Sequence, residues 1–241
     1  MTVHTLRRFD DELSQLKERV LSMGGLVERA IGNAVKSILE QDEKLARKTI
    51  SRDNDINALE VQCDDITRSI LVRRQPAAND LRFIIAIIKV VTDLERMGDL
   101  AVNLADEAIQ MQDHPPAEFS RMETLGNQVQ QQVNQTLDAL SRGDIHLAMS
   151  VIKKDKNVDN LYNSMYHELI ACMLDDPRTI SSSIALSNAA RNLERIADHA
   201  TNIAEMVIYN IQGHDIRHVD RKKVSRLLDN EKGMVRLNFS R

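Results

Sequence analysis

The stretch DLERMGDLAVNLAD, residues 93–106, returns as NLERIADHATNIAE at residues 192–205, with Glu, Arg, Asp and Asn at the same four places. A second segment, LARKTISRDNDINALE at residues 45–60, aligns with LAMSVIKKDKNVDNLY at residues 147–162. The interval of roughly 100 residues is that of a small domain copied in tandem, because solenoid units recur every 20–50 residues. The chain is therefore a doubled unit, and what its two copies share bears on function.

The prolines mark where the chain turns. Pro76 and Pro177 lie at comparable points inside the two copies, and the other two prolines stand together between the copies. We therefore predict that residues 1–113 form the first copy, residues 117–212 the second copy, and residues 213–241 a C-terminal tail.

The composition favours helices throughout. Only 3% of the residues are aromatic, there is no Trp, and no Gly occurs between residues 33 and 97, a profile unlike that of strands. Gly143 and Gly213 suit helix ends. The predicted fold class is all-α: two tandem antiparallel three-helix bundles related by the internal repeat. The helices are expected at about residues 6–40, 42–74, 79–111, 117–141, 145–174 and 179–212.

Several classes of protein are excluded. A net charge of −4 with almost no aromatic residues argues against nucleic-acid binding. No signal peptide and no run of 18 apolar residues is present, so we expect a cytoplasmic protein.

Cys63 and Cys172 do not occupy matching positions in the repeat, and we expect buried, reduced thiols. The tail from residue 213 has a mild basic excess that could contact an acidic partner or a membrane surface, but we favour a frayed terminal helix with solvated charges.

Two acidic pairs are the main candidates for a functional site. Glu95 and Asp99, and likewise Glu194 and Asp198, lie four residues apart on one face of the third helix of each copy. Like charges at this spacing cost a helix a few tenths of a kcal/mol unless something positive lies between them. A divalent cation is one candidate, since hard oxygen ligands on successive turns can line a groove. Two asparagines extend the pairs by one turn: Asn103 and Asn202.

A second interpretation of the pairs needs no metal. Arg96 and Arg195 lie three residues before each Asp and could neutralise it in a salt bridge. The spacing alone leaves both interpretations open.

The second helix of each copy offers further oxygen atoms. If the second and third helices run antiparallel, these side chains face the acidic pairs across a groove; otherwise they are ordinary exposed acids. They are Asp53, Asp55 and Asn57 in the first copy, and Asp155 and Asp159 in the second.

Signatures of catalysis are missing. No Glu-x-x-His occurs, which argues against a carboxylate-bridged di-iron oxidase, and there is no phosphate loop, nucleophile elbow or zinc-type cluster of Cys and His. His199 has Leu100 as its counterpart and is expected to be a surface or core histidine, with metal ligation as the alternative. We therefore expect a protein that is not an enzyme.

The doubled ERxxD stripe, Glu95 to Asp99 and Glu194 to Asp198, resembles the repeated motif of the PhoU family. RRQPAANDLR at residues 73–82, MGGLVERA at 23–30 and HDIRHV at 214–219 are also similar to segments of that family. The resemblance covers residues 6–220.

This resemblance implies two three-helix bundles related by a pseudo-twofold axis, homodimers, and bound iron, manganese, magnesium or zinc. It implies no enzymatic activity. Family members are described as cytoplasmic adaptors that link a phosphate ABC transporter to a sensor histidine kinase and repress the phosphate-starvation response. They reach the membrane only through these partners.

Carried over by position, the implied metal ligands are Glu95, Asp99, Glu194 and Asp198, followed by Asn103 and Asn202, and more weakly by Asp53, Asp155 and Asp159. Asn57 stands where the second copy has Asp159, so the two sites are expected to differ in ligand count. A carboxylate-liganded metalloenzyme and a metal-free helical scaffold are the alternatives.

Overall fold

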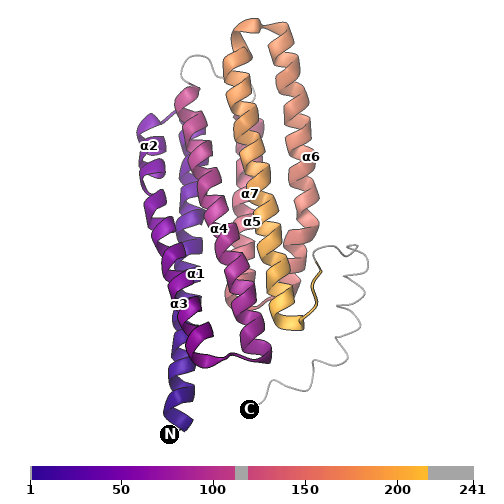
Figure 1. Cartoon of the computed structure of the whole chain (residues 1–241). Coiled ribbons are helices and arrows are strands. Elements are labelled where there is room, and N and C mark those ends of the chain that lie inside the picture. Colours follow the sequence, from indigo (N-terminus) through magenta and orange to yellow (C-terminus); the bar gives the residue numbers. More distant parts are fainter. Residues whose placement is uncertain (1, 112–118, 217–241) are drawn as a thin grey trace.

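The protein is all-α, as predicted, in a computed structural model that describes residues 2–111 and 119–216 (Figure 1). The first copy contains α1 (Thr2–Leu39), α2 (Glu43–Ser51), α3 (Asp53–Arg74) and α4 (Ala78–Gln110). The second copy contains α5 (Phe119–Arg142), α6 (Ile145–Asp175), the short 3-10 helix η1 (Pro177–Thr179) and α7 (Ile180–Gln212). The tail predicted from residue 213 lies, beyond Ile216, outside the described residues.

The prediction of one helix at residues 42–74 was wrong. The helix is interrupted at Arg52, so that α2 and α3 are separate, whereas the equivalent α6 is continuous. The hydroxyls of Thr49 and Ser51 donate to carbonyl oxygens four and three residues earlier. Such bonds compete with the helix ladder and bend helices. The second copy has Val151 and Lys153 at these positions, and neither can form this bond.

The helix ends follow the sequence signals elsewhere. Gly143 and Gly213 adopt positive φ angles of 65° and 76° directly after α5 and α7, as expected of glycines that terminate helices. Cys63 is buried, as predicted, and desolvation raises the pKa of its thiol to about 11. Cys172 is only partly buried, so the prediction for this residue was wrong in degree.

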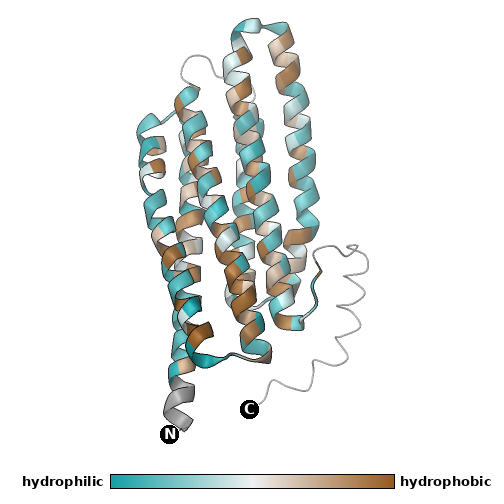
Figure 2. Cartoon of the chain, in the orientation of Figure 1, coloured by the Kyte–Doolittle hydropathy of each residue, from teal (hydrophilic) through white to brown (hydrophobic). Residues whose placement is uncertain are grey.

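The helices form two layers. In Figure 1, α3, α4, α7 and α6 lie side by side across the front, with α1 and α5 behind them. The most extensive helix pair is α4 with α7, the third helices of the two copies. Hydrophilic and hydrophobic residues alternate along the helices in Figure 2. None of the described helices is both long enough and apolar enough to cross a membrane.

Reciprocal glycine contacts show the internal twofold symmetry. A Cβ on Gly24 of α1 would lie 2.6 Å from Leu137 of α5, and a Cβ on Gly126 of α5 would lie 2.6 Å from Val35 of α1. Gly24 and Gly126 are equivalent in the repeat, as are Val35 and Leu137. The same close approach is therefore made twice, once in each direction, and it holds the rear layer together.

We predict that Gly126→Ala lowers the free energy of unfolding by about 1 kcal/mol, because overpacking against the stiff Val35 side chain outweighs the gain in helix propensity. The control is Gly25→Ala, whose Cβ would meet only Arg29 at 3.7 Å. This control should instead gain up to about 1 kcal/mol from helix propensity. Urea unfolding of both variants measures the difference, and equal effects would contradict the packing argument.

Candidate functional site

The two candidate sites are the lines of contact between α3 and α4 and between α6 and α7, which are called the first and second groove. Gly98 allows α3 and α4 to approach, since a Cβ there would lie 3.2 Å from Ile56 and 3.5 Å from Oδ1 of Asp53. Asp53 begins α3, and its charge interacts with that of Asp99 on α4. The second and third helices therefore bring their acids together across a groove, as the sequence suggested for Asp53.

Glu60 belongs to the same group, although the repeat in the sequence did not predict it. It lies on α3, two turns after Asp53, and its charge acts on Asp99 and Glu95. The signal was its helical spacing from Asp53, which was obscured because the second copy has Tyr162 at the equivalent place. The first groove therefore holds four carboxylates.

The second groove lies between α6 and α7 and also gathers four carboxylates. The charges of Asp155 and Asp159 on α6 act on Glu194 and Asp198 on α7. Asp155 is buried, and its Oδ1 accepts hydrogen bonds from Thr201 Oγ1 at 3.1 Å and from the Gln132 side chain at 3.3 Å. The two grooves therefore match in charge but not in detail.

Burial and repulsion raise the pKa values of the first groove. The pKa of Glu95 is raised by desolvation and then by the neighbouring charges of Asp99 and Glu60. Desolvation is also the main cause of the raised pKa values of Asp53 and Glu60. The groove is electrostatically unfavourable in the absence of a positive partner.

The second groove behaves in the same way. Desolvation and the charge of Asp198 raise the pKa of Glu194. Asp198 is an exposed residue, but the pKa of its carboxyl is raised, first by partial desolvation and then by the charges of Asp155 and Asp159. A cation in either groove would relieve this repulsion.

Arg96 and Arg195 do not form the salt bridges that the metal-free interpretation needs. Both are exposed, and within residues 2–111 and 119–216 no ion pair joins either of them to Glu95, Asp99, Glu194 or Asp198. Their charges only partly oppose the raised pKa values, Arg96 at Glu95 and Arg195 at Asp198. These two arginines therefore do not hold the four carboxylates of the acidic pairs in an ion pair.

The donor set of each groove fits a hard cation. Carboxylate oxygens are the donors that magnesium and manganese prefer, and zinc and iron also accept them. Oδ1 of Asp53 is buried and has no hydrogen-bond partner. In the described part of the chain, no three His, Cys, Asp or Glu side chains are already arranged to hold an ion. Binding would therefore require side-chain rotation to bring the oxygens together.

The remaining predicted oxygen donors lie in other contacts. Asn57 Nδ2 donates to Oδ2 of Asp53 at 2.8 Å, and Asn202 Nδ2 donates to Oδ1 of Asp93 at 3.3 Å. Asn103 and Asp55 are exposed. The ligand roles of Asn103 and Asn202 stay predictions.

A polar contact crosses the junction between the two copies. Nδ1 of His199 on α7 donates to Oδ1 of Asp93 on α4 at 2.8 Å, and each side chain is only 12% exposed. His199 thus has the structural role expected of it. The equivalent positions in the repeat are Leu100 and Asn192, so only one half of the junction carries this bond. The contact lies between the two acidic grooves and fixes α4 relative to α7.

Comparison with known proteins gives one consistent result. A family model described as the PhoU domain matches residues 20–108 and 122–207, one segment in each copy. A phosphate-specific transport system accessory protein PhoU homolog of Pseudomonas aeruginosa is 42% identical over 97% of this chain and 97% of that protein. PhoU of Escherichia coli is 36% identical over 93% of this chain and 94% of its own length.

Solved structures agree. The crystal structure of PhoU from Pseudomonas aeruginosa matches with a TM-score of 0.84 and 44% identity, over 86% of this chain and 100% of that chain. The phosphate transport system regulatory protein PhoU from Streptococcus pneumoniae matches with a TM-score of 0.81 and 28% identity, over 86% of this chain and 98% of that chain.

We predict that His199→Leu lowers the free energy of unfolding by about 1–3 kcal/mol, because Asp93 loses its main donor while it stays partly buried. The double variant His199→Leu with Asp93→Asn copies the residue pair of the other half, Leu100 and Asn192, and should recover most of the loss. Urea unfolding decides between them. A double variant no more stable than the single one would show that the bond is not the source of the effect.

The raised pKa values predict an unusual pH dependence. The folded state holds protons on Glu194 and Asp198 more tightly than the unfolded chain does, so the free energy of unfolding falls as the pH rises from about 4 through the folded pKa values. In protein stripped of metal by a chelator, Asp198→Asn should therefore raise the free energy of unfolding at pH 7 and weaken this dependence.

Urea unfolding at pH 4 and pH 7 is the measurement, with the exposed Glu18→Gln of α1 as the control. A less stable Asp198→Asn at pH 7 would mean that the carboxylate supports the fold through a direct contact.

Proposed function

This chain belongs to the PhoU family of phosphate-transport accessory proteins, which are not enzymes, and we propose that it acts as an adaptor between a phosphate ABC transporter and a sensor histidine kinase. The observation that supports this role most is the match to a PhoU homolog along 97% of both chains. In this role the protein represses the phosphate-starvation response when phosphate is plentiful. It works in the cytoplasm as a homodimer and reaches the membrane only through its partners.

The acidic grooves are proposed to hold metal ions of iron, manganese, magnesium or zinc. The ligands would come from Asp53, Glu60, Glu95 and Asp99 in the first groove and from Asp155, Asp159, Glu194 and Asp198 in the second. A bound ion would supply positive charge between two helices. The raised pKa values of the groove acids and the buried, unpartnered Oδ1 of Asp53 support this assignment.

Rigid helices suit an adaptor. The side chains of each groove lie on two different helices, so their joint attachment to one ion would fix the distance between those helices. A surface that is already ordered loses less conformational entropy when a partner binds. The absence of catalytic signatures in the sequence agrees with a role that depends on binding alone.

We predict that purified protein carries metal and that the variant with Glu95→Ala, Asp99→Ala, Glu194→Ala and Asp198→Ala does not, while its helical content is unchanged. Elemental analysis and circular dichroism measure both. The control is Asp11→Ala with Glu18→Ala, which removes exposed acids from α1 and should keep the metal. Equal metal content in all three proteins, or none in any after incubation with divalent ions, would leave a metal-free scaffold as the better description.

The adaptor role has a separate test. Cells of the host bacterium that lack this chain should express phosphate-starvation genes in phosphate-rich medium, and the unaltered chain should restore repression. Purified transporter subunits and the sensor kinase should each retain this chain in a pull-down assay. Retention by neither partner would contradict the adaptor role, whatever the metal content.

A further inference from the structure

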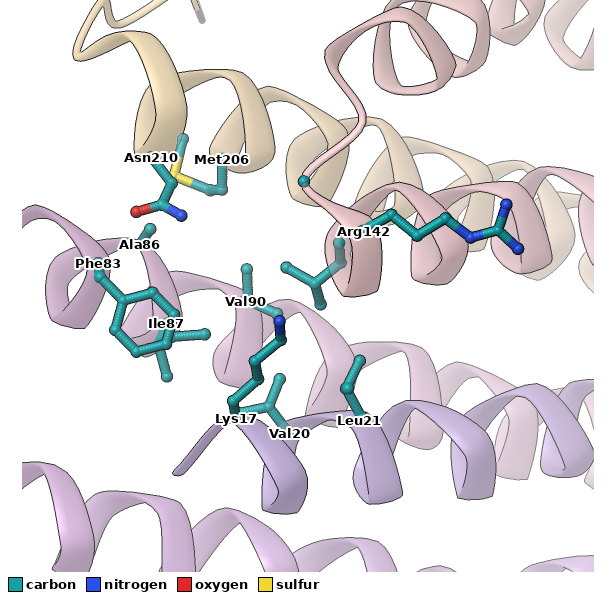
Figure 3. Close-up of a pocket in the computed structure, with 12 residues that line it drawn as sticks. Lys17, Val20, Leu21, Phe83, Ala86, Ile87, Val90, Arg142, Met206 and Asn210 are labelled. Atoms are coloured by element: carbon teal, nitrogen blue, oxygen red, sulfur yellow. The ribbon is translucent and has the colours of Figure 1, made fainter. Parts of the chain in front are cut away.

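A cavity of about 170 Å³ lies at one end of the junction between the two copies (Figure 3). Its walls come from α1 and α4 of the first copy and from the ends of α5 and α7 of the second. It is distinct from the acidic grooves, which lie between α3 and α4 and between α6 and α7. No carboxylate of the described residues lines it.

The interior of the cavity is apolar. Val20, Ile87, Val90 and Met206 form its walls, and each is at most 3% exposed. An apolar cavity of about 150 Å³ in another protein holds benzene, so this one has room for an apolar group of that size or slightly larger.

The exposed Lys17 lies at the rim of this apolar space. Figure 3 shows the ammonium group of Lys17 directed toward Val90, and the amide of Asn210 on the opposite side. Arg142 extends away along α5 in the same view, and its guanidinium lies 3.5 Å from Asp138. Lys17 has no ion-pair partner among the described residues. The cavity therefore combines apolar walls with the Lys17 ammonium group at its rim.

We propose that this cavity binds a small amphiphilic monocarboxylate, with its hydrocarbon chain between Val20, Ile87 and Met206 and its carboxylate at the Lys17 ammonium. A charge-assisted bond to Lys17 fixes the head group, and burial of methylene groups supplies the rest of the affinity. Because both copies contribute walls, the ligand stabilises the arrangement of the two bundles through mass action. The site is independent of the proposed metal grooves.

The test uses the absence of Trp from the chain. Phe83→Trp places a single fluorescent reporter in the cavity wall, and octanoate is the probe. We expect a saturable change of Trp emission below about 1 mM octanoate. The control is Tyr166→Trp, an exposed position on α6, whose emission should not change. Calorimetric titration of the parent chain with octanoate should give the same midpoint without a reporter.

The head group is tested separately. Lys17→Met should weaken octanoate binding about tenfold and leave octanol binding unchanged, whereas Lys36→Met, an exposed position on the same helix, should change neither. Ala86→Met should fill the cavity and abolish binding. Leu140→Phe is a second filling variant from a half-buried wall, in case Ala86→Met fails to fold.

Three results would overturn the proposal: no saturation with octanoate in the parent chain, the same response in Tyr166→Trp, or binding that survives both filling variants. An equal response to inorganic phosphate would also overturn it, because a site for a plain anion does not need the apolar walls.

Discussion

The packing of α4 against α7 is the constraint on which the rest of the structure depends. Leu94, Met97, Ala101 and Leu104 of α4 are buried, and so are their repeat equivalents Leu193, Ile196, Ala200 and Ile203 of α7. Each fully buried large apolar side chain contributes about 1.5–3 kcal/mol. Once this apolar stripe is buried, the helical period fixes the direction in which the neighbouring side chains point. Glu95 and Asp99, like Glu194 and Asp198, must then face the second helix of their own copy. The buried apolar positions that form the core therefore also determine the orientation of the carboxylates.

The grooves hold their charges at a cost to stability. Carboxylates whose pKa values are raised by burial and by each other destabilise the folded state at neutral pH. A fold selected only for stability would place uncharged residues at these positions, as the core does one residue away at Leu94 and Leu193. Four acids in each groove are therefore consistent with the positive partner proposed above. In the described part of the chain, the exposed Arg96 and Arg195 form no ion pair with the acidic pairs Glu95 and Asp99 or Glu194 and Asp198.

The sequence allowed the tandem repeat, the all-α class and the acidic pairs to be predicted, because all of these follow from local spacing that both copies share. Features that only one copy contains could not be predicted in this way. Glu60 was missed since Tyr162 stands at its equivalent position, and the interruption at Arg52 was missed since it depends on the hydroxyls of Thr49 and Ser51. The bond of Asn202 to Asp93 joins α7 to α4, and contacts between copies are not encoded in the spacing within one helix.

The differences between the copies make the two grooves unequal. In the second groove, Oδ1 of Asp155 already accepts bonds from Thr201 and Gln132, so part of its desolvation is offset by the protein itself. In the first groove, Oδ1 of Asp53 is buried without such a donor. Burial of an oxygen atom without a hydrogen-bond donor costs more free energy than burial of a bonded one. A ligand that satisfies this oxygen gains that difference in binding free energy. A cation would therefore gain more from the Asp53 oxygen than from the Asp155 oxygen, although both grooves carry the same number of carboxylates. The duplicated sequence has therefore produced two grooves with the same number of carboxylates, which differ in how far the protein's own donors satisfy the buried oxygens.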